Sequence, residues 1–191
     1  MVRYWKFIDE VHEYINLPSD NIPEIVFWGR SNVGKSSLIN SVTKSTIART
    51  SKVPGRTRAL IFFQLSDKLR IVDFPGYGYS TISKKDEFQL ENLIDQYLRK
   101  RLNISKLFLL IDSLHGFKKN DERIISELDN FIKDKFFIIF TKNDRVKNKK
   151  QKDLLEQYNL KAEKEFNKKF FNTSIKQADT IISLEKFLMN S

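Results

Sequence analysis

The chain has 191 residues and a formal net charge of +10, with a sequence pI near 9.6. This length suits one sizeable core and is short for two, so we expect a single domain over residues 1–191, with 1–22 as a short N-terminal extension. The sequence contains no cysteine, which excludes disulfides, thiolate metal sites and a cysteine nucleophile, and its two histidines stand far apart.

No stretch of the sequence approaches the roughly 20 apolar residues that a membrane-spanning helix needs. The first residues carry acids where a signal peptide has its apolar segment. We therefore expect a cytoplasmic protein with no membrane insertion. The excess of Lys and Arg suits a polyanionic partner such as nucleic acid, but lysines that merely solvate surface helices explain the charge equally well.

Apolar runs of strand length alternate with longer segments of helical period, which is typical of βα units and a mostly parallel sheet. Strands are predicted over residues 24–29, 58–66, 68–74, 106–112, 135–141 and 168–174. Helices are predicted from Gly34 onward and over residues 86–102, 121–134, 149–166 and 180–190. The second and third strands are nearly contiguous and form a hairpin. The predicted fold is a three-layer α/β domain with a mostly parallel six-stranded sheet, one antiparallel edge pair and helices on both faces.

The first predicted strand runs directly into a phosphate-loop sequence, GRSNVGKSS (29–37). Its glycines let backbone N–H groups wrap phosphates, and the helix that follows points its positive end at the same place. Lys35 is predicted to reach the β- and γ-phosphates of a nucleotide, and Ser36 to bind Mg²⁺. The match is specific because the strand before the loop and the helix after it are both in place.

A later strand ends in the sequence TKND (141–144), which narrows the choice of nucleotide. The carboxylate of Asp144 can accept hydrogen bonds from the N1–H and the 2-amino group of guanine, a donor pair that adenine lacks. Lys142 is predicted to lay its methylene stem along the base. The sequence TSIK (173–176), after the last strand, would support the base through its backbone.

Two further loops complete the expected site. Thr57, in VPGRTRA (53–59), is predicted to turn its hydroxyl to Mg²⁺ and its backbone N–H to the γ-phosphate. In DFPGYGYS (73–80), Asp73 would hold a Mg²⁺-bound water, and the Gly76 N–H would contact the γ-phosphate. Tyr77 stands where many GTPases carry the glutamine that orients the attacking water. The sequence thus leaves open whether the chain hydrolyses GTP or only switches on binding it.

The motifs GRSNVGKSSLIN, PGRTRALIFF, DFPGYGY, DSLHG, TKND and TSIK, in this order and spacing, resemble the EngB family of ribosome-biogenesis GTPases. The resemblance implies a P-loop NTPase fold of the Ras-like G-domain type, with GTP or GDP and Mg²⁺ bound. It also implies action in assembly of the large ribosomal subunit, with a possible link to cell division and septation. The expected partners are the large-subunit precursor, with its rRNA and ribosomal proteins, and the chain itself is expected to be a monomer.

The resemblance also implies which residues contact the nucleotide, the metal and the reacting phosphate. The expected nucleotide contacts are Gly29, Arg30, Ser31, Asn32, Val33, Gly34, Lys35, Ser36, Ser37, Gly55, Arg56, Thr57, Arg58, Ala59, Asp73, Phe74, Pro75, Gly76, Thr141, Lys142, Asn143, Asp144, Asn172, Thr173 and Ser174. Ser36, Thr57 and Asp73 form the expected Mg²⁺ site, and Lys35, Thr57, Gly76 and Asn32 are expected to act in hydrolysis. The chain departs from the family pattern at Leu114, where the family often has an arginine.

Two residues near these motifs have competing interpretations. Asn32 lies at a position where several related GTPases help to coordinate K⁺, which would add positive charge beside the phosphates; an asparagine that only stabilises the loop is the alternative. His115 has no evident partner for catalysis, which favours a hydrogen-bonded loop residue. Because no general base can be named, we expect slow intrinsic GTP hydrolysis that the ribosomal particle accelerates. The alternatives are a binding module without significant hydrolysis and a division-site regulator.

Overall fold

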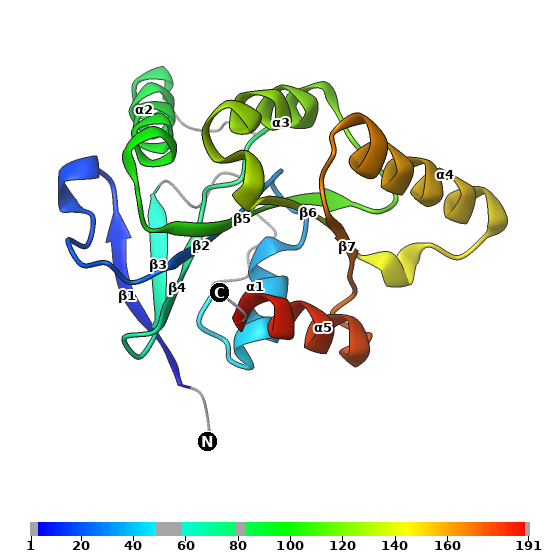
Figure 1. Ribbon diagram of the computed structural model, residues 1–191, viewed down its shortest axis with the longest axis horizontal. Helices are drawn as coiled ribbons and strands as arrows, with labels where there is room; N and C mark the ends of the chain where they lie inside the picture. Colours follow the sequence, from blue (N-terminus) through cyan, green and yellow to red (C-terminus); the bar gives the residue numbers. More distant parts are fainter. Residues whose placement is uncertain (1–3, 49–58, 79–82, 190–191) are drawn as a thin grey trace.

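A computed structural model describes residues 4–48, 59–78 and 83–189 of the chain (Figure 1). In these residues, seven strands form one sheet in the order β1-β3-β4-β2-β5-β6-β7. Their bounds are Trp5–Val11 for β1, Glu24–Gly29 for β2, Leu60–Leu65 for β3, Leu69–Asp73 for β4, Ile104–Asp112 for β5, Phe136–Thr141 for β6 and Phe170–Asn172 for β7. Strands β4, β2, β5, β6 and β7 run parallel to one another.

Helices cover both faces of the sheet, which confirms the predicted three-layer α/β fold (Figure 1). The α-helices span Lys35–Thr43 (α1), Lys84–Lys100 (α2), Lys119–Ile132 (α3), Lys149–Leu160 (α4) and Ala178–Met189 (α5). Apolar side chains of α1 and α5 pack on one face, and those of α2, α3 and α4 pack on the other. Within the described ranges, no helix is both long and apolar enough to cross a membrane.

The predicted number of six strands is wrong, because the segment assigned to an N-terminal extension contains β1. This strand pairs antiparallel with β3, which in turn pairs antiparallel with β4. The hairpin of β3 and β4 was predicted, whereas β1 pairs with residues about 50 to 60 positions further along the chain. Strand β1 also has mostly exposed side chains and a register shift between Phe7 and Asp9, so it lacks the alternating pattern of a half-buried strand.

The predicted helix over 149–166 is divided in the structure. Regular α4 ends at Leu160, and a π-helical turn follows over Lys161–Glu165. Lys161 forms an ion pair with Glu122 of α3 at 2.7 Å. This contact joins the widened turn to α3, a tertiary detail that a helical sequence pattern does not contain.

The parallel strands bring the polar motif residues to one edge of the sheet. Asp73 is the last residue of β4, Asp112 of β5 and Thr141 of β6, and Gly29 ends the neighbouring strand β2. Ligands of open α/β sheets bind at this edge, outside the carboxyl ends of the strands. The fold therefore places the phosphate-loop and TKND sequences side by side.

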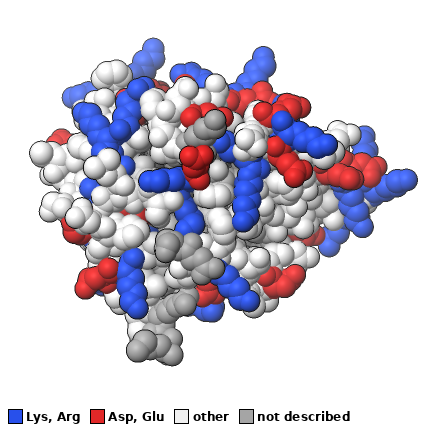
Figure 2. All heavy atoms as spheres, viewed as in Figure 1, with Lys and Arg blue, Asp and Glu red and all other residues white. Residues whose placement is uncertain are grey.

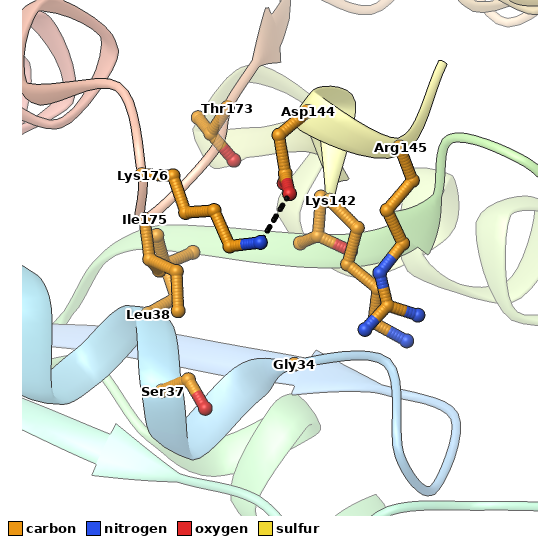
Figure 3. Close-up of a pocket in the computed structure, with 10 residues that line it drawn as sticks. Gly34, Ser37, Leu38, Lys142, Asp144, Arg145, Thr173, Ile175 and Lys176 are labelled. Carbon is orange, nitrogen blue, oxygen red and sulfur yellow. Dashed lines mark ion pairs between the residues drawn. The ribbon is translucent and has the colours of Figure 1, made fainter. Parts of the chain in front are cut away.

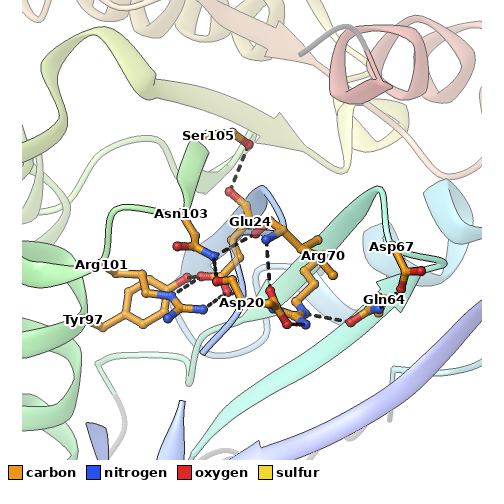
Figure 4. A network of polar contacts seen from close by, with 10 residues as sticks. Asp20, Glu24, Gln64, Asp67, Arg70, Tyr97, Arg101, Asn103 and Ser105 are labelled. Atoms are coloured by element: carbon orange, nitrogen blue, oxygen red, sulfur yellow. Dashed lines mark hydrogen bonds and ion pairs between the residues drawn. The ribbon is translucent and has the colours of Figure 1, made fainter. Parts of the chain in front are cut away.

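A polar network holds the opposite end of the sheet together (Figure 4). The carboxylate of Glu24, the first residue of β2, is fully buried. It accepts hydrogen bonds from the Tyr97 hydroxyl at 2.6 Å and from Arg101 Nε at 2.9 Å. Next to it, Arg70 of β4 pairs with Asp20, which fixes the chain before β2. A buried carboxylate is stable only when it is paired in this way.

Candidate nucleotide-binding site

The loop from β2 to α1 has the backbone shape that the phosphate-loop sequence predicts. A Cβ atom on Gly29 would lie 2.9 Å from the Leu110 carbonyl oxygen, so no side chain fits there. Gly34 has φ +104°, and Asn32 has φ +64°, both in the left-handed region. These conformations turn the chain tightly into α1 and leave its first N–H groups directed at the loop.

Lys35 and Asp73 form a buried ion pair at the base of this loop. Both side chains are less than a tenth exposed. Burial raises the pKa of the Asp73 carboxyl, and the positive charge of Lys35 opposes that rise. The residue predicted to contact phosphates and the residue predicted to hold a metal-bound water therefore contact each other. An anionic phosphate could replace Asp73 at Lys35, and oxygen donors such as this carboxylate and the Ser36 hydroxyl suit Mg²⁺.

The loop after β4 lies directly on the phosphate loop. The Ser31 N–H donates to the Tyr77 carbonyl oxygen at 3.0 Å, and the Tyr77 N–H donates to Gly29 at 3.3 Å. A Cβ atom on Gly76 would lie 3.0 Å from the Ser31 backbone, so the two loops are in tight contact there. The Trp28 indole N–H donates to the Pro75 carbonyl oxygen at 3.2 Å. The loop after β4, which is predicted to contact the γ-phosphate, thus lies against the predicted phosphate loop.

A pocket of about 130 Å³ opens beside the phosphate loop (Figure 3). Its lining residues are Gly34, Ser37, Leu38, Thr141, Lys142, Asp144, Arg145, Thr173, Ile175 and Lys176. Asp144 Oδ1 accepts a hydrogen bond from the Ser174 hydroxyl at 2.7 Å, and Lys176 Nζ lies 3.3 Å from Oδ2. The Ser174 hydrogen bond lowers the pKa of Asp144. Asp144 is therefore an ionised acceptor, as recognition of guanine requires.

Lys142 connects this pocket to the phosphate loop. It has φ +59°, and its Nζ donates to the Asn32 carbonyl oxygen at 2.7 Å and to Asp112 Oδ2 at 2.8 Å. Burial opposes ionisation of Asp112, yet hydrogen bonds from Lys142 and from the Leu114 N–H lower its pKa overall. The Thr141 hydroxyl donates to the Val33 carbonyl oxygen at 2.7 Å. The TKND segment and the phosphate loop thus form one connected unit.

The segment after β7 supports the pocket from the other side. The Asn143 N–H donates to the Thr173 carbonyl oxygen at 3.0 Å, and the Thr173 N–H donates to Phe140 at 2.7 Å. The side chains of Thr173 and Ser174 are buried, while Ile175 and Lys176 are exposed at the rim. Backbone contacts thus fix this segment beside the TKND loop.

Several predicted site residues lie elsewhere or outside the described residues. Gly55, Arg56, Thr57 and Arg58 fall outside the residues that the structure describes. Phe74, Val33 and Ala59 are buried in the core, so only their backbones can face a ligand. Leu38 and Arg145 line the pocket but were not predicted, and Ile175 and Lys176, predicted within TSIK to act through their backbone, also line it with their side chains. Arg145 directly follows TKND in the sequence, and that position was the signal that could have identified it.

Comparisons with known proteins agree with this geometry. A family model described as 50S ribosome-binding GTPase matches residues 24–142. The probable GTP-binding protein EngB of Mycoplasmopsis synoviae (strain 53) is 39% identical in an alignment of 189 residues, which covers 97% of this chain and 97% of that protein. The crystal structure of a probable GTP-binding protein engB has a TM-score of 0.65 and 26% identity, and covers 85% of this chain and 95% of that one. Era, solved in complex with MgGDPNP and nucleotides of 16S ribosomal RNA, shares the fold with a TM-score of 0.66 at 19% identity, over 88% of this chain and 56% of Era.

Proposed function

Because this chain belongs to the EngB family of P-loop GTPases, we propose that it is a switch that binds precursors of the large ribosomal subunit in its GTP form and leaves them after GTP hydrolysis. The proposal rests on one observation: the phosphate loop and the pocket beside Asp144 form a single connected unit. Lys142 joins these two parts through Asn32 and Asp112. One ligand with phosphates and a guanine base would therefore span both.

Each residue of the unit has a proposed role toward the nucleotide. Asp144 accepts from the guanine base, and Lys35 leaves Asp73 to contact the β- and γ-phosphates. Ser36, Thr57 and, through a water, Asp73 are the proposed ligands of Mg²⁺, which supplies positive charge to the phosphates when bound. Gly76 donates its N–H to the γ-phosphate. Loss of that phosphate would free the two loops, and this is how hydrolysis becomes a conformational signal.

We propose that intrinsic hydrolysis is slow and that the ribosomal particle accelerates it. The Tyr77 hydroxyl is bonded to Asp121 at 2.6 Å, and tyrosine lacks the amide that orients the attacking water in many GTPases. Single-turnover GTP cleavage with and without large subunits tests this proposal. A rate above background with subunits supports a hydrolase, whereas no cleavage under either condition would support a nucleotide-dependent binding module.

Asn32 is a proposed K⁺ ligand, and its backbone also supports the competing interpretation. Its φ of +64° favours asparagine for conformational reasons alone. The variant Asn32→Gly keeps access to this backbone conformation and removes the side-chain oxygen. If K⁺ contributes, wild-type hydrolysis is faster in KCl than in NaCl and the variant loses the difference. Equal wild-type rates in the two salts would remove the K⁺ role.

An RNA-containing partner is supported by the charge of the molecule. The net charge of +10 favours association with a polyanion. Lys and Arg side chains lie at the end of the molecule where α4 begins, at the right edge of Figure 2, together with acidic side chains. Era, which shares the fold, was solved with ribosomal RNA. We propose that rRNA of the large-subunit precursor is the polyanion here.

Co-sedimentation with large-subunit precursors tests the proposed function. We expect the chain to pellet with precursors in a non-hydrolysable GTP analogue and to stay in the supernatant in GDP. Equal sedimentation in both nucleotides would contradict a GTP-driven switch. Cell fractionation completes the test of the proposed cytoplasmic location, since recovery only in membranes would favour the division-site regulator. A single domain over 1–191 and a monomeric state also remain proposals, which limited proteolysis and light scattering can check.

A further inference from the structure

A buried carboxylate on α3 holds the side chain of Tyr77. The Tyr77 hydroxyl donates to Asp121 Oδ1 at 2.6 Å, and the Lys118 N–H donates to Oδ2 at 2.7 Å. Asp121 is fully buried. Arg30 Nε of the phosphate loop lies 3.3 Å from Oδ1, in an ion pair that lacks hydrogen-bond geometry. One carboxylate thus joins α3, the phosphate loop and the loop after β4.

The ring of Tyr77 is partly buried and packs against the core on the face of the sheet opposite α1. It packs edge-on against Trp28, with 5.5 Å between ring centroids. Trp28 belongs to the core that α2, α3 and α4 cover, and Tyr77 packs against that core. The apolar side chains of α1 belong to the core on the other face of the sheet. In this position the Tyr77 side chain serves to hold its loop.

Gly76 is fixed on both sides as a result. Before it, the Pro75 carbonyl oxygen accepts from Trp28, and after it, Tyr77 bonds the phosphate loop through its backbone and α3 through its hydroxyl. A loop held at both neighbours loses little conformational freedom when a ligand binds its central N–H. The anchor therefore prepares Gly76 for a hydrogen bond to phosphate.

We propose that Asp121 is a positioning residue for the γ-phosphate: through Tyr77 it holds the Gly76 N–H ready for GTP, and so it sets the preference for GTP over GDP. This inference rests on the proposed function, because it assumes that Gly76 contacts the γ-phosphate. GDP lacks that phosphate, so its affinity should not depend on the anchor. Tyr77 stands where many GTPases carry glutamine. In this proposal its role is structural, because its hydroxyl anchors the loop that contains Gly76.

The test compares nucleotide affinities of the isolated protein. Tyr77→Phe removes the hydroxyl and keeps the ring. By calorimetric titration we expect affinity for a non-hydrolysable GTP analogue to fall about fivefold to tenfold, because binding must then order a loop that the wild type already holds in place. GDP affinity should stay within about twofold. Asp121→Asn, which keeps the size of the side chain, should shift the ratio of affinities in the same direction.

The matched control is Tyr97→Phe, in the network of Figure 4. Tyr97 also donates its hydroxyl to a buried carboxylate at 2.6 Å, that of Glu24, but at the opposite end of the sheet. Both tyrosine variants should lower the unfolding midpoint, and only Tyr77→Phe should change the ratio of GTP-analogue to GDP affinity. Equal losses for both nucleotides, or an unchanged ratio, would overturn the inference. A wild type that binds no guanine nucleotide would instead refute the proposed function.

Discussion

At the scale of single residues, the contacts of Asp144 determine the ionisation of its carboxylate. Ser174 and Lys176 hold its two oxygens at the rim of the pocket, and they keep it ionised. Both partners come from a segment about 30 residues further along the chain. The proposed recognition of the base would thus depend on the contact between two loops that are distant in the sequence.

Asp144→Asn tests this arrangement. An amide cannot accept both guanine donors, so we expect GTP affinity to fall at least about tenfold, which corresponds to the loss of one charge-assisted hydrogen bond. Xanthine carries an oxygen in place of the 2-amino group, and the asparagine amide can donate to it. Xanthosine triphosphate should therefore bind the variant better than GTP does, in parallel titrations. Unchanged GTP affinity would remove Asp144 from the base contact.

The sequence predicted the motif loops of the site but not the contacts between them. Glycine spacing and the strand–helix context identify the phosphate loop, because its backbone shape is a local property. The role of Asp121 is different, since an aspartate in the first turn of a helix is ordinary and only the fold brings Tyr77 to it. The pairing of Lys35 with Asp73 is equally non-local.

At the scale of elements, the central strands were predicted within about two residues because they are buried on both faces and read as continuous apolar runs. Strand β1 was missed because it is an edge strand with charged side chains, and its hydrogen bonds go to the distant strand β3. The chain then reaches β2 through residues 12–23, where Asp20 is bonded to Arg70. That ion pair fixes the connection between the edge and the centre of the sheet.

Asp20→Asn should lower stability in a pH-dependent way. The hydrogen bond from Arg70 lowers the pKa of Asp20 in the folded protein, so its stabilisation is present above the unfolded pKa of about 3.9. It is lost as the pH falls through the lower folded value. We expect the variant to have a lower urea midpoint at neutral pH and a smaller difference from wild type in acid.

The matched control for this prediction is Asp95→Asn, which removes an ion pair with Arg99 on the surface of α2. Both side chains of that pair are about half exposed, so little stabilisation is expected from it. A difference between Asp20→Asn and wild type that is constant with pH would contradict the assigned pair.

At the scale of the whole molecule, the basic side chains differ in whether they form ion pairs. Arg145, Lys147, Lys149, Lys150 and Lys152 lie within eight residues, and within the part of the chain that the structure describes none of them forms an ion pair. The first turn of α4 contains no acid, although cations are unfavourable at the positive end of a helix. The helix dipole therefore does not account for these lysines, which fits the polyanionic partner proposed above.

The double variant Lys149→Glu/Lys150→Glu should weaken binding to large-subunit precursors and reduce the dependence of that binding on salt. Its control is Lys84→Glu/Lys85→Glu, with the same change of charge in the first turn of α2. Acids favour the start of a helix, so neither variant should lose stability. Equal precursor affinities of the two variants across a salt titration would show that only the total charge matters.

The position of Trp28 should make its intrinsic fluorescence sensitive to nucleotide binding. The chain has two tryptophans, and Trp5 lies in the far edge strand while the indole of Trp28 contacts Pro75 and Tyr77. In Trp5→Phe, fluorescence should come from Trp28 alone and change more on adding a GTP analogue than on adding GDP. Nucleotide exchange could then be followed in real time on an unlabelled protein, even while it is bound to its particle if that particle's own emission is subtracted.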